Sequence, residues 1–465
     1  MKSNRPTLPF TQLVGAACAC LLATAQAASG AAGALDQTFG IGGKMTTQLF
    51  ATGGYERPDP RAIAVQRDGK IVVAGKYLGV VEDFMVLRYN ADGTLDTDFG
   101  SNGVALTDFF GQVDEAGGVV IQGDGKIVAG GFAVVGLNPM GETNSAFALA
   151  RYNSDGSLDP TFGVGGKVTT DFLDNLDQGT GVLLQADGKI ILSGWVTQGP
   201  NDGTTYDFAV ARYNSNGTLD LTFGDQGKSF TDFNGDGDRA EWAVLQSDGK
   251  IVLAGHAFSP VTHSDFALAR YLPNGSLDPT FNGTGKVTTN FAGDFDELAW
   301  SVALAPDGKI VAGGWADNAP IFQAEADFAV ARYNPDGTLD TTFDSDGKWA
   351  RDISGTNESE YGRAITVLRN GKIVIAGSSH FRSVPGGGST DFAIIRLKTN
   401  GSYDNRFGNG GIVYTDFGEF NPGGTVTGDS AEAIFVQRDG KVLVAGTALL
   451  QTALYHAAIA RYLER

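Results

Sequence analysis

The 465-residue chain has almost no cysteine, and its two cysteines, Cys18 and Cys20, both lie within the first 20 residues. The rest of the chain therefore cannot form disulfides, offer a thiol nucleophile or build a cysteine zinc site. Histidine is also scarce. His256 and His263 share one predicted loop, but their spacing is not that of a helical metal motif, so we interpret them as solvated or locally bonded. A chain without disulfides needs a large apolar core, which the 42% hydrophobic residues supply.

Positive charge is in deficit, with 34 Lys and Arg against 53 Asp and Glu and a net charge of -19. Such a protein repels phosphate backbones and anionic membrane surfaces, so nucleic acid is excluded as an expected partner. Cations, basic proteins and glycans remain open as partners.

The N-terminal segment is typical of a secretory signal peptide. Lys2 and Arg5 precede an apolar run over 13–25, and the small residues Ala25 and Ala27 fit a cleavage site. We expect residues 1–27 to be removed and 28–34 to be a short linker. The alternative, a lipoprotein acylated at Cys18 or Cys20, lacks the preceding branched apolar residue. We expect a secreted or periplasmic monomer without a transmembrane segment.

Glycine is abundant, with 66 residues, and much of it belongs to a repeat of about sixty residues. Three markers each occur seven times. The first, Asp-Gly-Lys, starts at Asp68, Asp124, Asp187, Asp248, Asp307 and Asp439, with Asn370 as a variant. The second, Leu-Asp-x-x-Phe, starts at Leu35, Leu95, Leu158, Leu219, Leu277 and Leu339, with Tyr403 as a variant. The third is an arginine, at Arg88, Arg151, Arg212, Arg270, Arg332, Arg396 and Arg461.

Each repeat predicts four β-strands, because Asp-Gly between β-prone runs is a strong hairpin signal and no sustained helical period occurs. The second strands, such as 71–74, are apolar on both faces and must lie between two layers. Residues 35–465 therefore predict an all-β, seven-bladed β-propeller with four-stranded blades. The chain starts with a fourth strand, over 45–49, and ends with a third strand, over 457–462. The N-terminal strand is thus predicted to close the last blade.

The combination of Gln-x-Asp-Gly-Lys-Ile-Val-x-Ala-Gly, Asp-Phe-Ala-x-Ala-Arg-Tyr-Asn and Gly-x-Leu-Asp-x-Thr-Phe-Gly resembles the bacterial delta-60 repeat over residues 35–462. The resemblance implies a secreted or surface bacterial repeat protein and brings no established catalytic activity with it. Asn370, Tyr403 and Ala457 depart from the pattern.

The repeated arginines and the aspartates of Leu-Asp-x-x-Phe are interpreted as a scaffold. A guanidinium offers a planar pair of donors to a carboxylate, and a residue needed in every blade is structural by default. We expect each arginine to pair with an aspartate within or between blades.

An acid lies ten residues before the turn in six of the seven repeats, at Asp114, Asp177, Asp238, Glu297, Glu360 and Asp429. These positions lie where one blade passes to the next, and we expect a carboxylate ring near the channel mouth. Hard oxygen ligands suit calcium or magnesium, so this ring is a candidate metal site. The competing interpretation is that each acid caps a loop or pairs with a repeated cation.

Variable loops between second and third strands share a face with these acids and carry aromatic residues. Tyr77, Phe132, Trp195, Phe258, Trp315 and Phe381 are the candidate binding residues, since such rings stack on sugars or anchor proteins. The alternative is that they pack onto the blades.

No catalytic motif stands out, so no catalytic residue is assigned and no cofactor is required, with calcium as an optional ligand. The leading hypothesis is a binding module for a protein, glycan or cation. A hydrolase using acids in the channel, and a purely structural surface protein, remain alternatives.

Overall fold

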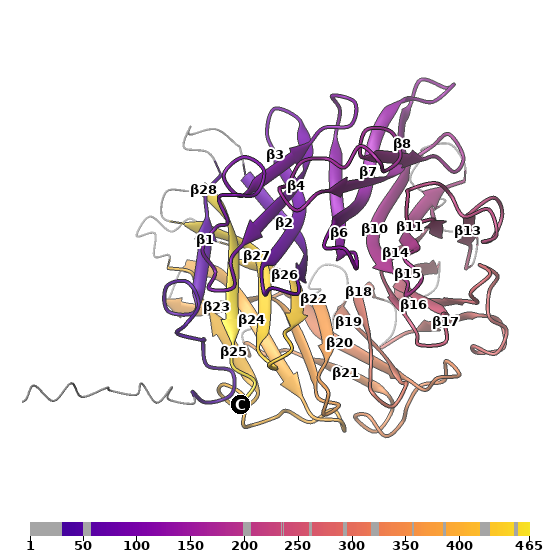
Figure 1. The fold of residues 1–465 in the computed structure, drawn as a ribbon. Helices are drawn as coiled ribbons and strands as arrows, with labels where there is room; N and C mark the ends of the chain where they lie inside the picture. The colour runs from indigo at the N-terminus through magenta and orange to yellow at the C-terminus, as the bar shows by residue number, and fades with distance from the viewer. Residues whose placement is uncertain are drawn as a thin grey trace, which may run out of the picture.

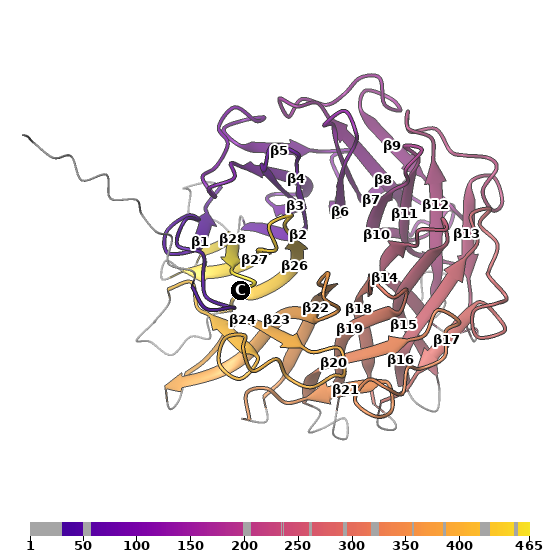
Figure 2. The ribbon, with the colours of Figure 1, turned by 60° about the horizontal axis from the view of Figure 1, so that its bottom comes forward.

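The structure is a computed structural model that describes residues 30–465 apart from 50–56, 199–205, 234, 236, 260–262, 292–294, 318–324, 356–357, 385–386, 419–427 and 451–453. Seven four-stranded antiparallel sheets are arranged around a central axis, as Figures 1 and 2 show. The predicted seven-bladed, all-β propeller is confirmed. The predicted signal peptide, residues 1–27, lies outside the described residues.

Each blade runs from its innermost to its outermost strand in chain order, except the seventh. Blade 1 contains β2 (Arg57–Val65), β3 (Ile71–Leu78), β4 (Glu82–Tyr89) and β5 (Val104–Thr107), and blade 2 contains β6 (Asp114–Ile121), β7 (Ile127–Leu137), β8 (Thr143–Tyr152) and β9 (Lys167–Thr170). Blade 3 contains β10 (Asp177–Leu184), β11 (Ile190–Thr197), β12 (Tyr206–Tyr213) and β13 (Lys228–Thr231), and blade 4 contains β14 (Asp238–Leu245), β15 (Ile251–Ser259), β16 (His263–Tyr271) and β17 (Lys286–Thr289). Blade 5 contains β18 (Glu297–Leu304), β19 (Ile310–Asp317), β20 (Ala326–Tyr333) and β21 (Lys348–Arg351), and blade 6 contains β22 (Glu360–Val367), β23 (Ile373–Val384), β24 (Gly387–Leu397) and β25 (Ile412–Thr415). Blade 7 contains β26 (Ser430–Val436), β27 (Val442–Leu450), β28 (Leu454–Tyr462) and β1 (Lys44–Thr47).

The two ends of the chain share blade 7, as predicted. The strand β1 is antiparallel to β28, with Lys44 opposite Ala460 and Thr47 opposite Ala457. The predicted linker also contacts the ring, because the Gly33 amide donates to the Leu463 carbonyl at 2.8 Å and the Ala32 carbonyl accepts the Gly408 amide at 2.9 Å. Residues 32–34 are thus part of the seam rather than a free tether.

The core lies between neighbouring blades, because second and third strands bury both faces. All eight residues of β11 are buried, for example, and one apolar cluster joins Phe281 of blade 4 to Val302 and Ile310 of blade 5. Each strand therefore contributes apolar surface to two layers, which explains its near-continuous apolar sequence.

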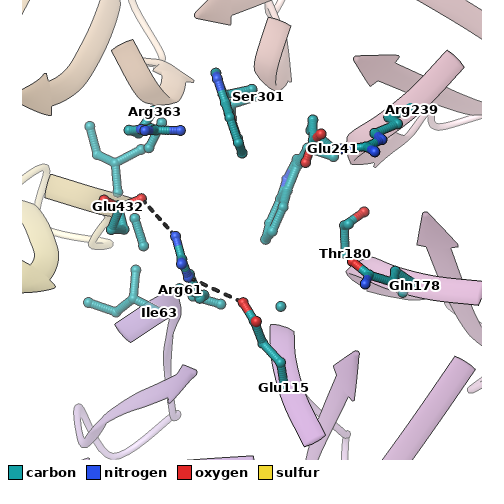
Figure 3. A pocket seen from close by; sticks show the side chains of 18 of the residues that line it. Arg61, Ile63, Glu115, Gln178, Thr180, Arg239, Glu241, Ser301, Arg363 and Glu432 are labelled. Atoms are coloured by element: carbon teal, nitrogen blue, oxygen red, sulfur yellow. Dashed lines mark hydrogen bonds and ion pairs between the residues drawn. The ribbon is translucent and has the colours of Figure 1, made fainter. Parts of the chain in front are cut away.

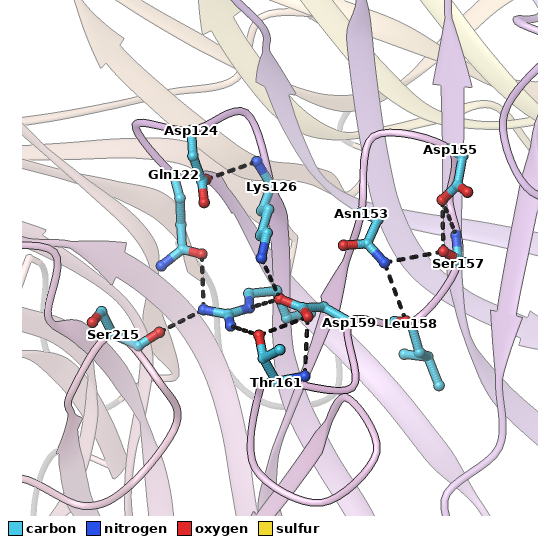
Figure 4. A network of polar contacts seen from close by, with 11 residues as sticks. Gln122, Asp124, Lys126, Asn153, Asp155, Ser157, Leu158, Asp159, Thr161 and Ser215 are labelled. Carbon is cyan, nitrogen blue, oxygen red and sulfur yellow. Dashed lines mark hydrogen bonds and ion pairs between the residues drawn. The ribbon is translucent and has the colours of Figure 1, made fainter.

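A repeated polar cluster fastens the face that carries the Asp-Gly-Lys turns; we call it the staple. In each blade the arginine Nε of the third strand donates to the aspartate of Leu-Asp-x-x-Phe at 2.6–2.8 Å. The lysine of Asp-Gly-Lys lies 2.6–3.3 Å from the same carboxylate. Figure 4 shows the staple of blade 2, where Lys126 and Thr161 join Asp159. The predicted pairing is thus present in all seven blades.

The staple also links each blade to the next. Arg88 Nη1 donates to the Ser154 carbonyl at 2.6 Å, and Arg461 Nη1 donates to the Ala91 carbonyl at 2.7 Å across the seam. The tyrosine that follows most of these arginines links its blade to the preceding one. Tyr89 of blade 1, for example, donates to Thr47 of blade 7 at 2.9 Å. The repeated arginine and the tyrosine that follows it therefore each link neighbouring blades.

Candidate functional site: the central channel

The innermost strand of every blade contains a β-bulge. In β14, for example, Ala240 lies opposite Gly255 and Trp242 lies opposite Ala254, so Glu241 has no partner on β15. The same register shift occurs in the first strand of the other six blades. A bulge adds a residue to one strand and re-aims its side chain.

The bulged residues differ from blade to blade, although their surroundings repeat. They are Arg61, Gly117, Thr180, Glu241, Trp300, Arg363 and Glu432, each three positions after the predicted acid or its equivalent. All seven line one cavity in the channel. The propeller thus varies the one position in each blade that the bulge directs toward the axis.

The glycine of the Ile-Val-x-Ala-Gly marker makes this bulge sterically feasible. A Cβ atom on Gly255 would lie 1.8 Å from the Arg239 carbonyl oxygen, and one on Gly194 would lie 1.9 Å from that of Gln178. The equivalent glycines in the other blades meet the corresponding oxygens at 1.8–2.0 Å. The constant glycine therefore leaves the space that the bulge with its variable residue requires.

The cavity has a volume of about 330 Å³ and combines charged, polar and aromatic walls. Besides the bulged residues it is lined by Glu115, Gln178, Arg239, Trp195 and Trp242. In Figure 3 the labelled side chains, among them Arg61, Glu115 and Arg239, converge from several blades on one open space. Its lining runs along the innermost strands, from Glu115 near the start of β6 to Ile365 near the end of β22, and includes Phe132 and Trp195 of two second strands.

Arg61 occupies one side of the cavity and is held by carboxylates of three blades. Its guanidinium lies 3.1 Å from Asp59 and 3.4 Å from both Glu115 and Glu432. Figure 3 shows the contacts with the two glutamates. Burial, followed by the charges of Glu432 and Glu115, raises the pKa of Asp59. This side of the channel is thus electrostatically satisfied by the chain itself.

Arg239 and Arg363 occupy the other side and are stacked on aromatic rings. The Arg239 guanidinium lies 4.1 Å from the Tyr206 ring centroid and 4.8 Å from that of Trp195. Arg363 lies 4.2 Å from the Trp300 ring centroid. Stacking fixes the plane of a guanidinium and leaves its edge for hydrogen bonds. Within the described part of the chain, neither arginine has a carboxylate within 4.0 Å.

Three buried donors in this cavity have no hydrogen-bond partner among the described residues: Nε of Arg61, Nε of Arg363 and Nε1 of Trp300. Arg61 Nε still lies 3.4 Å from a Glu115 oxygen, whereas Arg363 has no carboxylate within 4.0 Å in the described part of the chain. A buried donor without a partner costs free energy, and in native structures it marks a place where a water or a ligand belongs.

Glu241 also lines the cavity and lies between Arg239 and Arg363 (Figure 3). Burial raises the pKa of its carboxyl to about 7, against the opposing charges of Arg239 and Arg363. Across from Arg239 on β15, burial and that same arginine lower the pKa of His256 to about 3, so this histidine is neutral at physiological pH. Glu241 alone of the two can change its charge near neutrality.

The predicted acid ring lies elsewhere. Asp114, Asp177, Asp238, Glu297, Glu360 and Asp429 are all buried, and none lines the channel cavity. Each instead accepts a backbone amide from the loop that enters its blade, as Phe233 donates to Asp238 at 2.6 Å. The side chains alternate along a strand, so the acid faces the neighbouring blade while the residue after it faces the axis.

The predicted aromatic residues divide into two groups. Phe132, Trp195 and Trp315 occupy the same position of their second strands, opposite Glu115, Gln178 and Leu298, and the first two line the cavity. Tyr77 is buried, and Phe258 is partly exposed at the end of β15. The second strands extend further than predicted, so these residues lie in strands rather than loops. The side chain of Phe381 lies outside the described part.

The sequence analysis missed the bulged residues because it considered only positions that carry the same kind of residue in every repeat. They are visible once the repeats are aligned on the predicted acid and read three positions later, where the neighbours stay small or apolar and this position ranges from glycine to arginine and glutamate. The signal in the sequence was therefore one variable position between neighbours that change little from repeat to repeat.

A seven-bladed propeller with an asymmetric channel pocket is the class that the fold and site define. Six segments match the family model described as "Domain of unknown function (DUF5122) beta-propeller": residues 66–99, 122–162, 185–223, 246–281, 305–343 and 368–407. The description of this model as a propeller agrees with the fold. No curated protein matches the sequence.

Solved structures resemble the chain at low identity. An ulvan lyase of polysaccharide lyase family PL25 is 13% identical with a TM-score of 0.49, covering 90% of this chain and 96% of that chain. An α-L-arabinanase of Penicillium chrysogenum is 10% identical with a TM-score of 0.39, covering 74% of this chain and 91% of that chain. These similarities concern the propeller fold and bear on no residue of the channel. The described residues contain no helix long and apolar enough to cross a membrane.

Proposed function

We propose that this protein is a binding module whose channel holds a saccharide fragment bearing a carboxylate or sulfate group. One observation carries the proposal: Arg239 and Arg363 are stacked in the cavity with their edges unpaired, and the Arg363 Nε donor is buried without a partner among the described residues. A guanidinium in this state is suited to a bidentate contact with an anionic group.

The remaining walls support a saccharide rather than a simple anion. The partly exposed indole rings of Trp242 and Trp300 offer apolar surface, and Gln178 and Thr180 offer donors and acceptors for hydroxyl groups. The volume of about 330 Å³ suits a ligand of one or two sugar rings.

The proposal is tested by calorimetric titration of the protein with acidic and neutral oligosaccharides of matched length. Acidic members should bind, and Arg363→Gln should weaken binding at least about tenfold, the loss of one charge-assisted contact. Arg67→Gln is the matched control, because Arg67 is exposed on the turn face. Equal binding of neutral and acidic members, or no effect of Arg363→Gln, would contradict it.

An enzyme is the second candidate, and Glu241 is the observation that favours it. A carboxyl with a pKa of about 7 beside two arginines is suited to proton transfer at neutral pH. Incubation of the same oligosaccharides with the protein distinguishes the candidates. Shortened products that disappear with Glu241→Gln, while binding persists, would replace the binding module with a saccharide-cleaving enzyme.

We further propose that the repeats are of the delta-60 type and that the protein acts as a monomer outside the cytoplasm, after cleavage behind Ala27. The apolar run over 13–25 and the basic residues before it support this localisation. N-terminal sequencing of protein purified from its host tests the cleavage, and recovery of an intact Met1 would contradict it.

A further inference from the structure

Three strand ends meet at each blade junction on the face opposite the turns. They are the start of a third strand, the residue after a fourth strand and the first residue of the next blade. At two junctions these positions carry three aspartates whose oxygens lie within 4.8 Å of one another. The first cluster, between blades 1 and 2, is Asp83, Asp108 and Asp114, and the second cluster, between blades 3 and 4, is Asp207, Asp232 and Asp238.

The innermost aspartate of each cluster is fully buried and has one oxygen without a donor. Asp114 and Asp238 are each 0% exposed, and in each one Oδ2 accepts a loop amide at 2.6 Å. Oδ1 of both residues has no hydrogen-bond partner among the described residues. A fully buried carboxylate oxygen without a donor is costly, so a ligand is expected to meet it.

Lysines that approach the two clusters bind backbone oxygens instead of the carboxylates. Lys167 donates to the Asp108 carbonyl at 2.9 Å, and Lys286 donates to the Asp232 carbonyl at 2.8 Å. In the described ranges no ion pair within 4.0 Å joins a lysine or arginine to a carboxylate of the first or second cluster. Like charges so close together repel unless a cation or a proton lies between them.

Two other junctions show how the chain itself can satisfy the innermost acid. Between blades 6 and 7, Asp429 accepts the Leu449 amide at Oδ1 at 3.2 Å and the Phe417 amide at Oδ2 at 3.1 Å. Between blades 5 and 6, Glu360 likewise accepts backbone amides at both oxygens, at 2.8 and 2.9 Å. These junctions are closed by the protein's own donors, so we assign no ion to them.

In the first and second clusters the donor equivalent to the Leu449 amide is engaged elsewhere. The equivalent second-strand amides are those of Val134 and Phe258. They donate to the carbonyls of Val113 and Gly237 at 2.9 and 3.1 Å. The buried oxygen of each cluster is therefore left open to a ligand.

We propose that the first and second clusters each bind one calcium ion. All donors are oxygens, which suits a hard cation and not the soft metals of thiolate or imidazole sites. Calcium accepts about six to eight oxygens in irregular arrangements, so carboxylates and water can form its shell, whereas magnesium demands a nearly ideal octahedron. These sites are separate from the channel and do not depend on the ligand proposed there.

The junction between blades 2 and 3 has the open oxygen but lacks the third carboxylate. Asp177 is 0% exposed, and its Oδ1 has no partner among the described residues. The third-strand position, however, is Ala146, and Asp171 already accepts the Asn144 amide at 2.9 Å. Since calcium affinity depends on the number of charged ligands, we assign no ion here.

Calcium uptake by the intact, chelator-treated protein is measured by isothermal titration with calcium chloride and by native mass spectrometry. The titration is done at pH 8, because burial, followed by the charges of Asp207 and Asp232, raises the pKa of Asp238 to about 7 and a proton would compete at lower pH. We expect two ions for the native chain and one for Asp108→Asn or Asp232→Asn. Both aspartates are exposed, so the variants should fold.

Asp416→Asn is the matched control. It removes the exposed aspartate at the equivalent position of the closed junction between blades 6 and 7. Because Asp429 there has a donor at each oxygen, the variant should take up as many ions as the native chain.

Three results would overturn the proposal. The first is no uptake at about 10 mM free calcium, roughly ten times the weakest dissociation constants of protein calcium sites. The second is uptake that neither Asp108→Asn nor Asp232→Asn reduces, because it would place the ions away from the two clusters. The third is an equal loss in Asp416→Asn, which would show that the open oxygen does not select the sites.

Discussion

The turn face carries the same residues in every blade, whereas the channel carries different ones. On the turn face every blade presents the same arginine, aspartate and lysine at nearly the same distances. In the channel the equivalent position changes from arginine to glycine, threonine, glutamate and tryptophan around the ring. Residues that repeat hold the ring together, and residues that break the repeat are where a ligand could be recognised.

The buried staple holds its aspartate in the charged form. Burial alone would raise the pKa of Asp340, but hydrogen bonds from Thr342 and the charge of Arg332 outweigh it and lower the pKa to about 2. The arginine also lies over the phenylalanine of Leu-Asp-x-x-Phe, 4.5–4.8 Å from its ring centroid in all seven blades. Removing one partner therefore leaves a charge buried against an aromatic ring.

The strongest test of the repeated region is the seam. Deletion of residues 35–50 removes β1, the buried Phe39 and Asp36, which pairs with Arg461 at 2.8 Å. We expect the free energy of unfolding to fall by at least about 5 kcal/mol, the sum of a lost core aromatic and a broken buried ion pair. Thermal unfolding measures the effect, and an unchanged midpoint would refute closure by this strand.

A single staple should give the next largest effect. We expect Asp340→Asn to lower the free energy of unfolding by about 3 kcal/mol, because it leaves Arg332 buried and unpaired. Asp225→Asn, exposed on the surface, is the control and should change it by less than about 0.5 kcal/mol. Chemical denaturation of both variants measures the difference, and equal losses would show that the staples contribute little.

The staples also predict the direction of acid destabilisation. Since the folded pKa of Asp340, about 2, lies below its ordinary value of 3.8, the ionised form favours the folded state. Its contribution is complete above pH 4 or so and is lost as the pH falls toward 2. Asp340→Asn should lose less stability than the native chain over that interval, which denaturation at pH 5 and pH 2.5 measures.

The glycine behind the bulge should matter less than a staple but more than a surface glycine. In Gly255→Ala the new Cβ would lie 1.8 Å from the Arg239 carbonyl oxygen, so the strands must separate. We expect a loss of about 2 kcal/mol, typical of overpacking. Gly123→Ala is the matched control, because nothing lies within 4 Å of its added Cβ. Similar melting points for the two variants would contradict the steric role of the glycine.

Glu241→Gln should hardly affect stability but should change how ligand binding depends on pH. With a pKa of about 7, Glu241 is protonated below neutrality and then no longer repels an anionic ligand. Binding of an acidic oligosaccharide should therefore be tighter at pH 6 than at pH 8 in the native chain, and nearly pH-independent in Glu241→Gln. A pH dependence that survives the substitution would assign it to another group.

Sequence reasoning recovered the features that repeat. The arginine and aspartate that pair in blade 1, Arg88 and Asp96, have equivalents in all seven repeats. Their pairing, the number of blades and the closing strand could therefore be predicted. It did not recover Glu241, because a bulge interrupts the alternation that strand patterns assume. It also placed Asp238 at the channel mouth, although the third-strand Asp207 and the loop residue Asp232 that it meets are distant in sequence.

The pairing of β1 with β28 has a consequence for how the protein is made. The last blade cannot form before the whole chain is available, because its outer strand is β1, near the start of the chain, and its other three strands are the last ones. Until then β1 of one copy can pair with β28 of another, which would give a strand-swapped dimer.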